Sequence, residues 1–473
     1  MSRSTIYRLL VLLFAFALVA AACGSSDSDS SAGGDDVASP ESSEDESSGS
    51  DSGLATEGVV ELAAGTSVDL SVCPDDWSAT TGVDGDEIRF GQSLPQTGAL
   101  AAFGPIADGI EAYFDWVNAN DPIDGKELVL VARDDAYESG RTVANIEEMI
   151  DTEEIFAFTT IIGSPNNGAA RPILDEACVP QAFNATGLPD WGDPASFPWT
   201  VGGLLAYNTE ASLWCENIVS ELGEGATVAA LFMNNDFGAA YQSGIEGCAA
   251  DGLIDLVANE VHEATAPDIT NEMTNMIASE ADAFIFGSTS AFCPQSVGGI
   301  ASSTWRPLFY MSNTCSNLAA FFEPVQDAAG VIADEGSAVR MVSNVKNFTD
   351  PTYSDDPAIV EGIQILADAG LDEAGSQSTG IIFGYYTEQT LRKALADYGE
   401  INRVTFMAAA WNLNIEASPY LLDGIGNITD GTNDAFLVEG ARVEEVIVDG
   451  GALTFSPVSE LISVEGTTGT FGG

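Results

Sequence analysis

Residues able to do acid–base or nucleophilic chemistry are scarce in this sequence. It holds one histidine, His262, and 14 basic residues against 73 acidic ones. A Ser-His-Asp or Cys-His arrangement would have to use His262, and no G-x-S-x-G elbow or G-x-x-x-x-G-K phosphate loop occurs. The sequence also lacks the Cys-x-x-Cys and His-x-x-x-His pairs that hold metals. We therefore expect no enzyme activity, no metal and no cofactor.

Asp134 and Asp135 are paired carboxylates that could exchange protons with a substrate. They follow the apolar run at 128–132 and precede a helical pattern. Carboxylates at such positions commonly stabilise the N-terminus of a helix. We favour this structural role over an acid–base role.

Hydroxyl and amide side chains gather in short loops that follow apolar runs between residues 86 and 191. The runs at 128–132 and 155–162 are continuously apolar, as strands covered on both faces must be, and helical spacing separates them. This alternation predicts an α/β fold with a doubly wound parallel sheet, in which ligands bind beyond the carboxyl ends of the strands. Those ends carry the small polar loops 96–98, 134–135, 163–167 and 184–187.

The same stretch carries four segments, in order, that resemble the leucine/isoleucine/valine-binding family of ABC-importer substrate-binding proteins. They are SLPQTGALAAFG (93–104), DDAYESGRTVANIEEMI (134–150), GSPNN (163–167) and VPQAFNATGLPDW (179–191). The resemblance implies a type I periplasmic binding protein, in which a three-segment hinge joins two Rossmann-like doubly wound lobes and the ligand lies between them. It also implies a branched-chain amino acid as the first candidate ligand.

The domain boundaries follow from the resemblance and from the strand–helix alternation that resumes after the first lobe. We expect the first lobe at 86–203 and 336–438, and the second at 204–335 and 439–473. An N-terminal extension at 58–85 precedes them.

The resemblance assigns first-lobe residues to a ligand's carboxylate. Ser164 with Asn166, and Ala185 with Thr186, would offer hydroxyl and backbone N–H donors at a helix N-terminus. A simple helix cap is the alternative for Ser164, because Pro165 follows it. Phe103 could form a wall of the cleft or lie in the core.

Further positions follow from the second lobe and the hinge. Phe237 stands where the family has an aromatic residue that closes over the ligand, and Thr289 where it presents another cleft residue. Tyr385 and Tyr386 open a helix beside the hinge, and we expect Tyr385 in the cleft, with a core position as the alternative.

The sequence departs from the family pattern at Asn313. Amino-acid binders of the family commonly hold the ligand's ammonium with an acidic residue at this position. Because an unpaired ammonium in a closed cleft is costly, either Asp190 or Asp236 supplies the charge from elsewhere, or the ligand is an amide, a carboxylic acid or an aromatic acid.

Residues 1–23 are typical of a bacterial lipoprotein signal. Basic residues precede an apolar run at 9–22, and small residues then lead to Cys23, which would become the lipidated N-terminus. Ala20 stands where a leucine is usual, so a plain secretory signal is the alternative. Residues 24–57 are rich in Ser, Asp, Gly and Glu and predict a disordered tether.

An exported chain favours disulfides, and six cysteines remain after Cys23. Six cysteines allow 15 connectivities, and free buried thiols are also possible. Their neighbours in the sequence favour the pairs Cys73 with Cys178, Cys215 with Cys248, and Cys293 with Cys315.

The net charge of −59 argues against a nucleic-acid partner, whose phosphates need basic side chains. Such acidity suits a saline habitat or serves solubility, and we favour the first.

Together these features predict a solute-binding lipoprotein on the outer face of the cytoplasmic membrane. It would bind a small amino-acid-like, amide or carboxylate ligand by hinge closure and deliver it to an ABC permease. The alternatives are a sensory ligand-binding protein of the same fold, an exported hydrolase that uses His262, and a structural surface protein.

Overall fold

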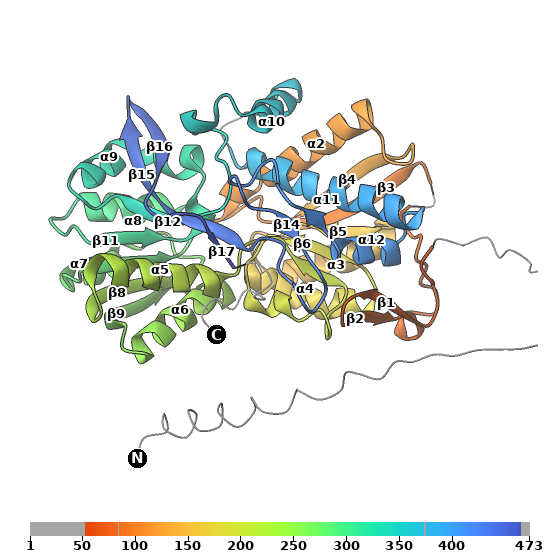
Figure 1. Cartoon of the computed structure of the whole chain (residues 1–473), viewed down its shortest axis with the longest axis horizontal. Helices are drawn as coiled ribbons and strands as arrows, with labels where there is room; N and C mark the ends of the chain where they lie inside the picture. The colour runs from red at the N-terminus through yellow and green to blue at the C-terminus, as the bar shows by residue number, and fades with distance from the viewer. Residues whose placement is uncertain (1–52, 84, 373–374, 465–473) are drawn as a thin grey trace, which may run out of the picture. The chain divides into compact units, whose positions relative to one another are not determined.

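The computed structural model describes residues 53–83, 85–372 and 375–464. The predicted signal segment, Cys23 and most of the predicted tether lie outside these residues. The described chain forms two lobes, each with a central sheet between helices (Figure 1).

The first lobe is built on a parallel sheet. In sheet order its strands are β4 (Glu127–Asp134), β3 (Glu87–Leu94), β5 (Ala157–Thr159), β6 (Gln181–Asn184) and β7 (Thr200–Gly202). Every neighbouring pair in this order runs parallel. The predicted doubly wound α/β architecture is confirmed.

Helices cover both faces of the first sheet. They are α2 (Ile106–Asn120), α3 (Ser139–Glu153), α4 (Ser164–Glu176), α11 (Gln377–Tyr398) and α12 (Arg403–Ala410). Helix α2 packs against α11, and α3 packs against α4. Because successive strand residues point to opposite faces, Ala157 joins the core beneath α2, whereas Phe158 joins a second cluster with Ile146 and Leu174.

The second lobe has a mixed sheet. In sheet order its strands are β9 (Ile254–His262), β8 (Ala226–Met233), β10 (Ala283–Gly287), β11 (Leu308–Met311), β12 (Val339–Ser343), β15 (Gly440–Asp449) and β16 (Ala452–Pro457). The strands from β9 to β12 run parallel, and β15 and β16 are antiparallel. The short strand β17 (Ile462–Ser463) also pairs with β15.

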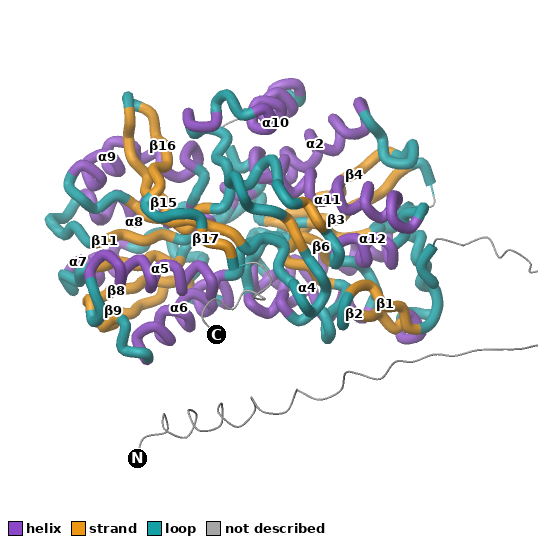
Figure 2. The backbone as a smooth tube through the Cα atoms, viewed as in Figure 1, coloured by secondary structure: helices purple, strands orange, loops and turns teal. Residues whose placement is uncertain are grey.

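The helices of the second lobe alternate with its parallel strands. They are α5 (Tyr207–Leu222), α6 (Asp236–Ala250), α7 (Thr270–Ala278), α8 (Phe292–Ala301) and α9 (Gln326–Asp334). Figure 2 shows this alternation of strands and helices in each lobe.

The boundary expected at 336 between the lobes is wrong. Strand β12 pairs with β11 and with β15, so the chain stays in the second sheet through Ser343. It then returns to the first lobe, where α10 (Pro357–Asp368) packs on α2. The cause of the error is that an apolar strand fits either sheet by pattern alone.

The N-terminal extension is fixed to the first lobe. Its hairpin of β1 (Val59–Ala63) and β2 (Thr66–Asp69) packs against α12. Cys73 is bonded to Cys178, and the indole N–H of Trp77 donates to the carbonyl of Cys178 at 2.8 Å. A second small hairpin pairs β13 (Asn414–Ile415) with β14 (Asn427–Ile428).

The remaining disulfides lie in the second lobe. Cys215 of α5 is bonded to Cys248 of α6, and Cys293 of α8 is bonded to Cys315. Their Cα atoms are 6.5 Å and 6.0 Å apart. Together with Cys73–Cys178, these are the pairs that the sequence neighbourhood favoured.

Candidate functional site

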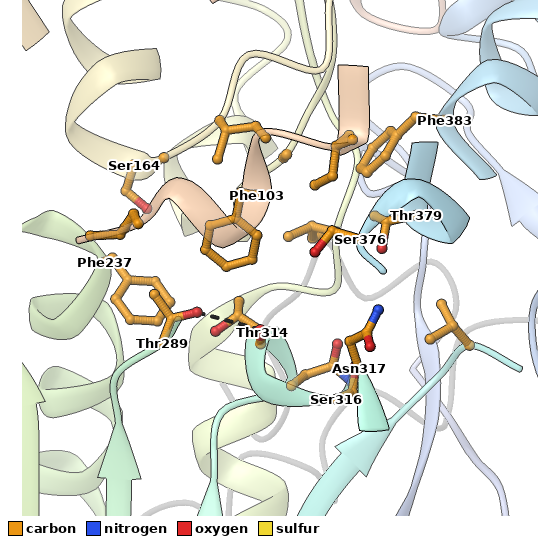
Figure 3. Close-up of a pocket in the computed structure, with 18 of the residues that line it drawn as sticks. Phe103, Ser164, Phe237, Thr289, Thr314, Ser316, Asn317, Ser376, Thr379 and Phe383 are labelled. Atoms are coloured by element: carbon orange, nitrogen blue, oxygen red, sulfur yellow. Dashed lines mark hydrogen bonds between the residues drawn. The ribbon is translucent and has the colours of Figure 1, made fainter. Parts of the chain in front are cut away.

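A cavity of about 140 Å³ lies between residues of the two lobes (Figure 3). Its first-lobe wall comes from the loops that follow β3, β4, β5 and β6 and from the beginning of α11. Its second-lobe wall comes from the start of α5 and α6 and from the loops that follow β10, β11 and β12. The cavity is lined by Leu100, Phe103, Ile106, Tyr137, Ile162, Gly163, Ser164, Ala185, Leu204, Tyr207, Phe237, Thr289, Asn313, Thr314, Ser316, Asn317, Phe321, Asn344, Val345, Ser376, Thr379, Ile382 and Phe383.

Most of the positions predicted for the ligand lie at this cavity. Those that line it are Phe103, Ser164, Ala185, Phe237, Thr289 and Asn313. Those that do not are Asn166, Thr186 and Tyr385.

The structure places these three residues outside the cavity lining. Asn166 is fully buried beside α3, where its Oδ1 accepts from Ser139 Oγ at 3.3 Å. Thr186 is buried one layer behind the wall and bonds to Ser164. Tyr385 packs edge-on against Tyr420, away from the cavity.

Hydroxyl groups from both lobes meet where α4 begins, with Ser164 and Thr186 from the first lobe and Tyr207 from α5 of the second. Ser164 Oγ lies 2.6 Å from Thr186 Oγ1, and the Tyr207 hydroxyl hydrogen-bonds with both. Burial raises the pKa of Tyr207 to about 12, so all three groups are uncharged at neutral pH. N–H groups in the first turn of a helix lack intrahelical acceptors, so this end of the cavity suits an anionic or carbonyl oxygen.

Gly163 allows the loop before α4 to approach the loop after β4. Its φ is 101°, and a Cβ at this position would overlap the ring of Tyr137. Only glycine therefore lets Tyr137 lie against this turn and line the cavity.

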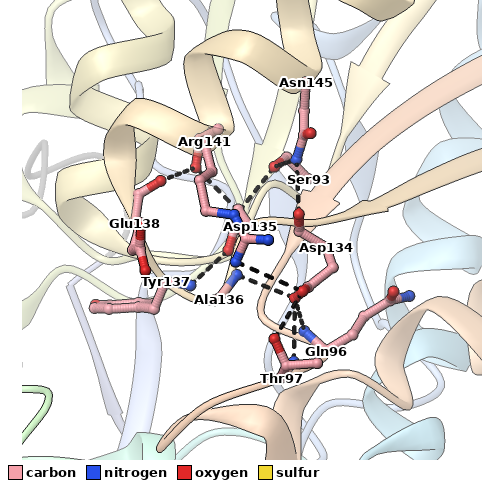
Figure 4. A network of polar contacts seen from close by, with 11 residues as sticks. Ser93, Gln96, Thr97, Asp134, Asp135, Ala136, Tyr137, Glu138, Arg141 and Asn145 are labelled. Carbon is pink, nitrogen blue, oxygen red and sulfur yellow. Dashed lines mark hydrogen bonds and ion pairs between the residues drawn. The ribbon is translucent and has the colours of Figure 1, made fainter.

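Asp134 and Asp135 position the loop that carries Tyr137 (Figure 4). Asp134 accepts from the N–H groups of Gln96 and Thr97 at 2.9 and 3.1 Å. Asp135 accepts from Ser93 Oγ at 2.8 Å and from the N–H of Tyr137 at 2.8 Å. These bonds give the two carboxylates the structural role that we favoured, although they fix a loop as well as a helix start.

The second-lobe wall rests on a buried acid. Glu210 accepts from the Tyr241 hydroxyl at 2.6 Å and from the Asn313 N–H at 2.7 Å. Tyr241 also lies 2.9 Å from Ser312 Oγ, which bonds to Thr314. Burial raises the pKa of Glu210 to about 8.

Helix α11 supplies one face to the cavity. Thr379, Ile382 and Phe383 share this face, and Ser376, just before the helix, donates to the carbonyl of Ala102 at 2.6 Å. Their spacing of three and four residues indicates a common face. The sequence does not distinguish this face from the face that carries Tyr385, because most of the helix is buried.

Comparison with known proteins decides the family. Residues 87–452 match the family described as periplasmic binding protein. The chain belongs to this family. No curated protein sequence matches it.

Solved structures that share the fold of this periplasmic binding protein belong to proteins described with different ligands. One is a branched-chain amino acid ABC transporter from Thermus thermophilus with bound valine, at TM-score 0.69 and 18% identity, covering 80% of this chain and 96% of that one. Another is a fatty acid ABC transporter substrate-binding protein from Thermomonospora curvata, at TM-score 0.66 and 15% identity, covering 84% and 99%.

A third is a solute-binding protein from Rhodopseudomonas palustris BisB5 in complex with 3,4-dihydroxybenzoic acid. Its TM-score is 0.65 at 16% identity, and the alignment covers 80% of this periplasmic binding protein and 98% of that chain. At these identities the likeness shows a shared fold.

His262 of this periplasmic binding protein is buried away from the cavity wall. Its Nε2 lies 2.8 Å from Ser288 Oγ, and its Nδ1 lies 3.1 Å from the carbonyl of Glu263. Burial lowers the pKa of His262 and favours the neutral ring. Ser288 is fully buried and does not line the cavity.

No charged side chain lines the cavity among the described residues of this periplasmic binding protein. Asp190 lies elsewhere and pairs with Arg171 at 3.9 Å, and Asp236 is exposed at the start of α6. Within the same described ranges, no group of acidic, His and Cys side chains could hold a metal ion, and no helix is long and apolar enough to cross a membrane.

Proposed function

We propose that this protein is the extracytoplasmic solute-binding component of an ABC importer. The observation that carries the proposal is the cavity, because residues of both lobes enclose it at the ends of their strands. We further propose that residues 1–23 direct export and that a lipid on Cys23 tethers the protein to the outer face of the membrane. Deleting the thiol in Cys23→Ala should then release the protein from the membrane fraction.

The proposed mechanism is hinge closure around the ligand. Across the cavity, Ser290 Oγ donates to the carbonyl of Ala99 at 3.2 Å, and Asn317 Nδ2 donates to the carbonyl of Gly375 at 3.1 Å. The rings of Phe103 and Phe321 also meet, with centroids 6.1 Å apart. Opening the hinge would break these contacts and the hydrogen bonds of Tyr207 to Ser164 and Thr186, and a ligand that touches both lobes restores closure.

The proposed ligand is a small amino-acid-like compound, amide or carboxylate. Ser164 and the first turn of α4 offer donors to an oxygen at one end of the cavity. The solved structures of the same fold support a broad choice, since they include a complex with valine, a fatty acid transporter's binding protein and a complex with 3,4-dihydroxybenzoic acid.

We propose that no reaction occurs on the ligand. The pair that most resembles a catalytic dyad, Ser288 with His262, is buried outside the cavity wall. Turnover of candidate esters or amides that His262→Ala abolishes would contradict this part of the proposal.

A thermal-shift assay with small molecules extracted from a bacterial cell lysate tests solute binding. A ligand at about 100 times its dissociation constant stabilises the folded state by roughly 2.7 kcal/mol, which gives a clear rise in melting temperature. We expect at least one extract fraction to raise the melting temperature. If no fraction does so, solute binding is not the function of this cavity.

A further inference from the structure

Resting on the proposed function, we infer that the ligand is a monocarboxylate with a compact apolar body, aromatic or branched aliphatic, and no ammonium group. The ligand's carboxylate lies at the start of α4 and its body among the aromatic rings. This excludes α-amino acids as the preferred ligands of the cavity.

Two buried acids near the cavity, Glu210 and Asp135, already accept hydrogen bonds from other groups of the protein. Both oxygens of Glu210 accept hydrogen bonds, one from the Tyr241 hydroxyl and one from the Asn313 N–H. Asp135 is likewise fully buried and is bonded to Ser93 and to the backbone of Tyr137. Neither side chain lines the cavity.

An α-ammonium group would therefore enter the closed cavity without a carboxylate partner. Desolvating an unpaired ion costs several kcal/mol even after the protein relaxes. Hydroxyl and amide oxygens could solvate the ion only in part. The same compound without its amino group avoids this cost entirely.

The rings around the cavity fit a compact apolar body. Phe103, Phe237, Phe321 and Phe383 line it together with aliphatic side chains such as Ile382. The volume of about 140 Å³ is close to that of an engineered protein cavity of roughly 150 Å³ that binds benzene. One ring or one branched chain of similar size fits this space.

Uncharged donors receive the carboxylate. Ser164 Oγ lies at the start of a 13-residue helix and within 2.6 Å of Thr186 Oγ1. Figure 3 shows Ser164 on one side of Phe103, with Ser376 and Thr379 on the other side. The two ends of the cavity therefore differ in charge preference, because the N-terminus of α4 favours a negative group at the Ser164 end.

Matched pairs that differ only in the amino group test the inference. The pairs are 3-phenylpropanoate with phenylalanine, and 4-methylpentanoate with leucine, titrated calorimetrically into the full mature chain. We expect the amine-free member of at least one pair to bind more than about ten-fold more tightly than its partner. Equal or tighter binding of the amino acids would overturn the inference.

Two further affinity measurements test whether the cavity recognises the ligand's carboxylate. The amide 3-phenylpropanamide should bind at least about ten-fold more weakly than 3-phenylpropanoate. Ser164→Ala should weaken binding of the acid more than binding of the amide, whereas the control Ser303→Ala, after α8 and outside the cavity, should change neither. If the amide binds as tightly as the acid, the ligand's carboxylate is not what the cavity recognises. If Ser164→Ala weakens binding of the acid and of the amide equally, the carboxylate does not lie at Ser164.

The outcomes separate the inference from the proposed function. If amino acids bind more tightly, the solute-binding function stands and the inference fails. If a cell extract raises the melting temperature but no member of either pair binds, the inference also fails. If neither the extract nor the pairs bind, the proposed function itself fails.

Discussion

Cys293 is bonded to Cys315, which links the first turn of α8, next to the loop that supplies Thr289 to the cavity, to the segment that supplies Asn313. Both cysteines are fully buried, and the bond closes a segment with a sequence separation of 22. Thr289 donates to the carbonyl of Thr314 at 3.4 Å, which links the same loops a second time. The disulfide therefore holds the second-lobe wall in one arrangement before the ligand arrives.

Replacing this disulfide should weaken binding as well as stability. In Cys293→Ser/Cys315→Ser the two loops lose their covalent link, so the ligand must order them at the cost of about a ten-fold loss of affinity. Calorimetric titration of the tightest ligand measures this loss.

Cys215→Ser/Cys248→Ser is the matched control, because this disulfide joins later turns of α5 and α6 and neither cysteine lines the cavity. Both double variants should lose roughly 2–5 kcal/mol of stability. Equal affinity in the two variants would show that Cys293–Cys315 does not organise the wall.

Phe237→Leu should reduce ligand affinity while the fold persists. Phe237 lines the cavity and meets the rings of Tyr207 and Tyr241 at 5.1 and 5.3 Å. The control is Phe284→Leu, since Phe284 is fully buried in β10 outside the cavity. Both changes remove a buried ring, but only the first should raise the dissociation constant; the same effect in both would mean that Phe237 acts through stability alone.

Glu210 should make the fold less stable as the pH rises. Its pKa is raised to about 8 in the folded state from an ordinary value near 4.5, so the folded state binds the proton more tightly than the unfolded chain. The contribution of Glu210 to the free energy of unfolding is fully present below about pH 4.5 and is lost as the pH rises to about 8.

Glu210→Gln removes this titration and serves as the reference. The melting temperature of the wild type, measured relative to the variant, should fall between pH 5 and pH 8, a window of about three units set by the raised pKa. A constant difference across that window would contradict a raised pKa in the folded protein.

Salt should stabilise this protein. A net charge of −59 produces repulsion in the compact state, and the screening length falls from roughly 10 Å at 0.1 M to roughly 3 Å at 1 M salt. We expect the melting temperature to rise with sodium chloride over this range. No rise would argue against adaptation to a saline habitat.

The sequence located the loops of the site better than the side chains within them. The loops after β3, β4, β5 and β6 were predictable, because carboxyl ends of parallel strands meet at one edge of a sheet. Whether the side chain of Ser164 or of Thr186 reaches the cavity depends on the direction of the backbone within a turn. This direction cannot be predicted from the sequence pattern.

Helix faces and strand membership were harder to predict. The helix α11 is buried nearly all round, so periodicity could not choose between the face of Phe383 and that of Tyr385. Strand β12 fits either sheet by its apolar pattern, and pairing with β15, about 100 residues later, decides its lobe. Tyr137, in the loop after β4, and Tyr207, the first residue of α5, both line the cavity, but no sequence motif marks either position.

The measurement that tests the central claim most directly is a thermal-shift comparison of the wild type with Ala185→Trp. Ala185 lines the cavity between the lobes, so an indole there fills the space that the ligand needs. The control Ala240→Trp places the same ring on α6 outside the cavity wall. We predict that the ligand raises the melting temperature of the wild type and the control but not of Ala185→Trp. An equal rise in all three proteins would show that the ligand binds elsewhere.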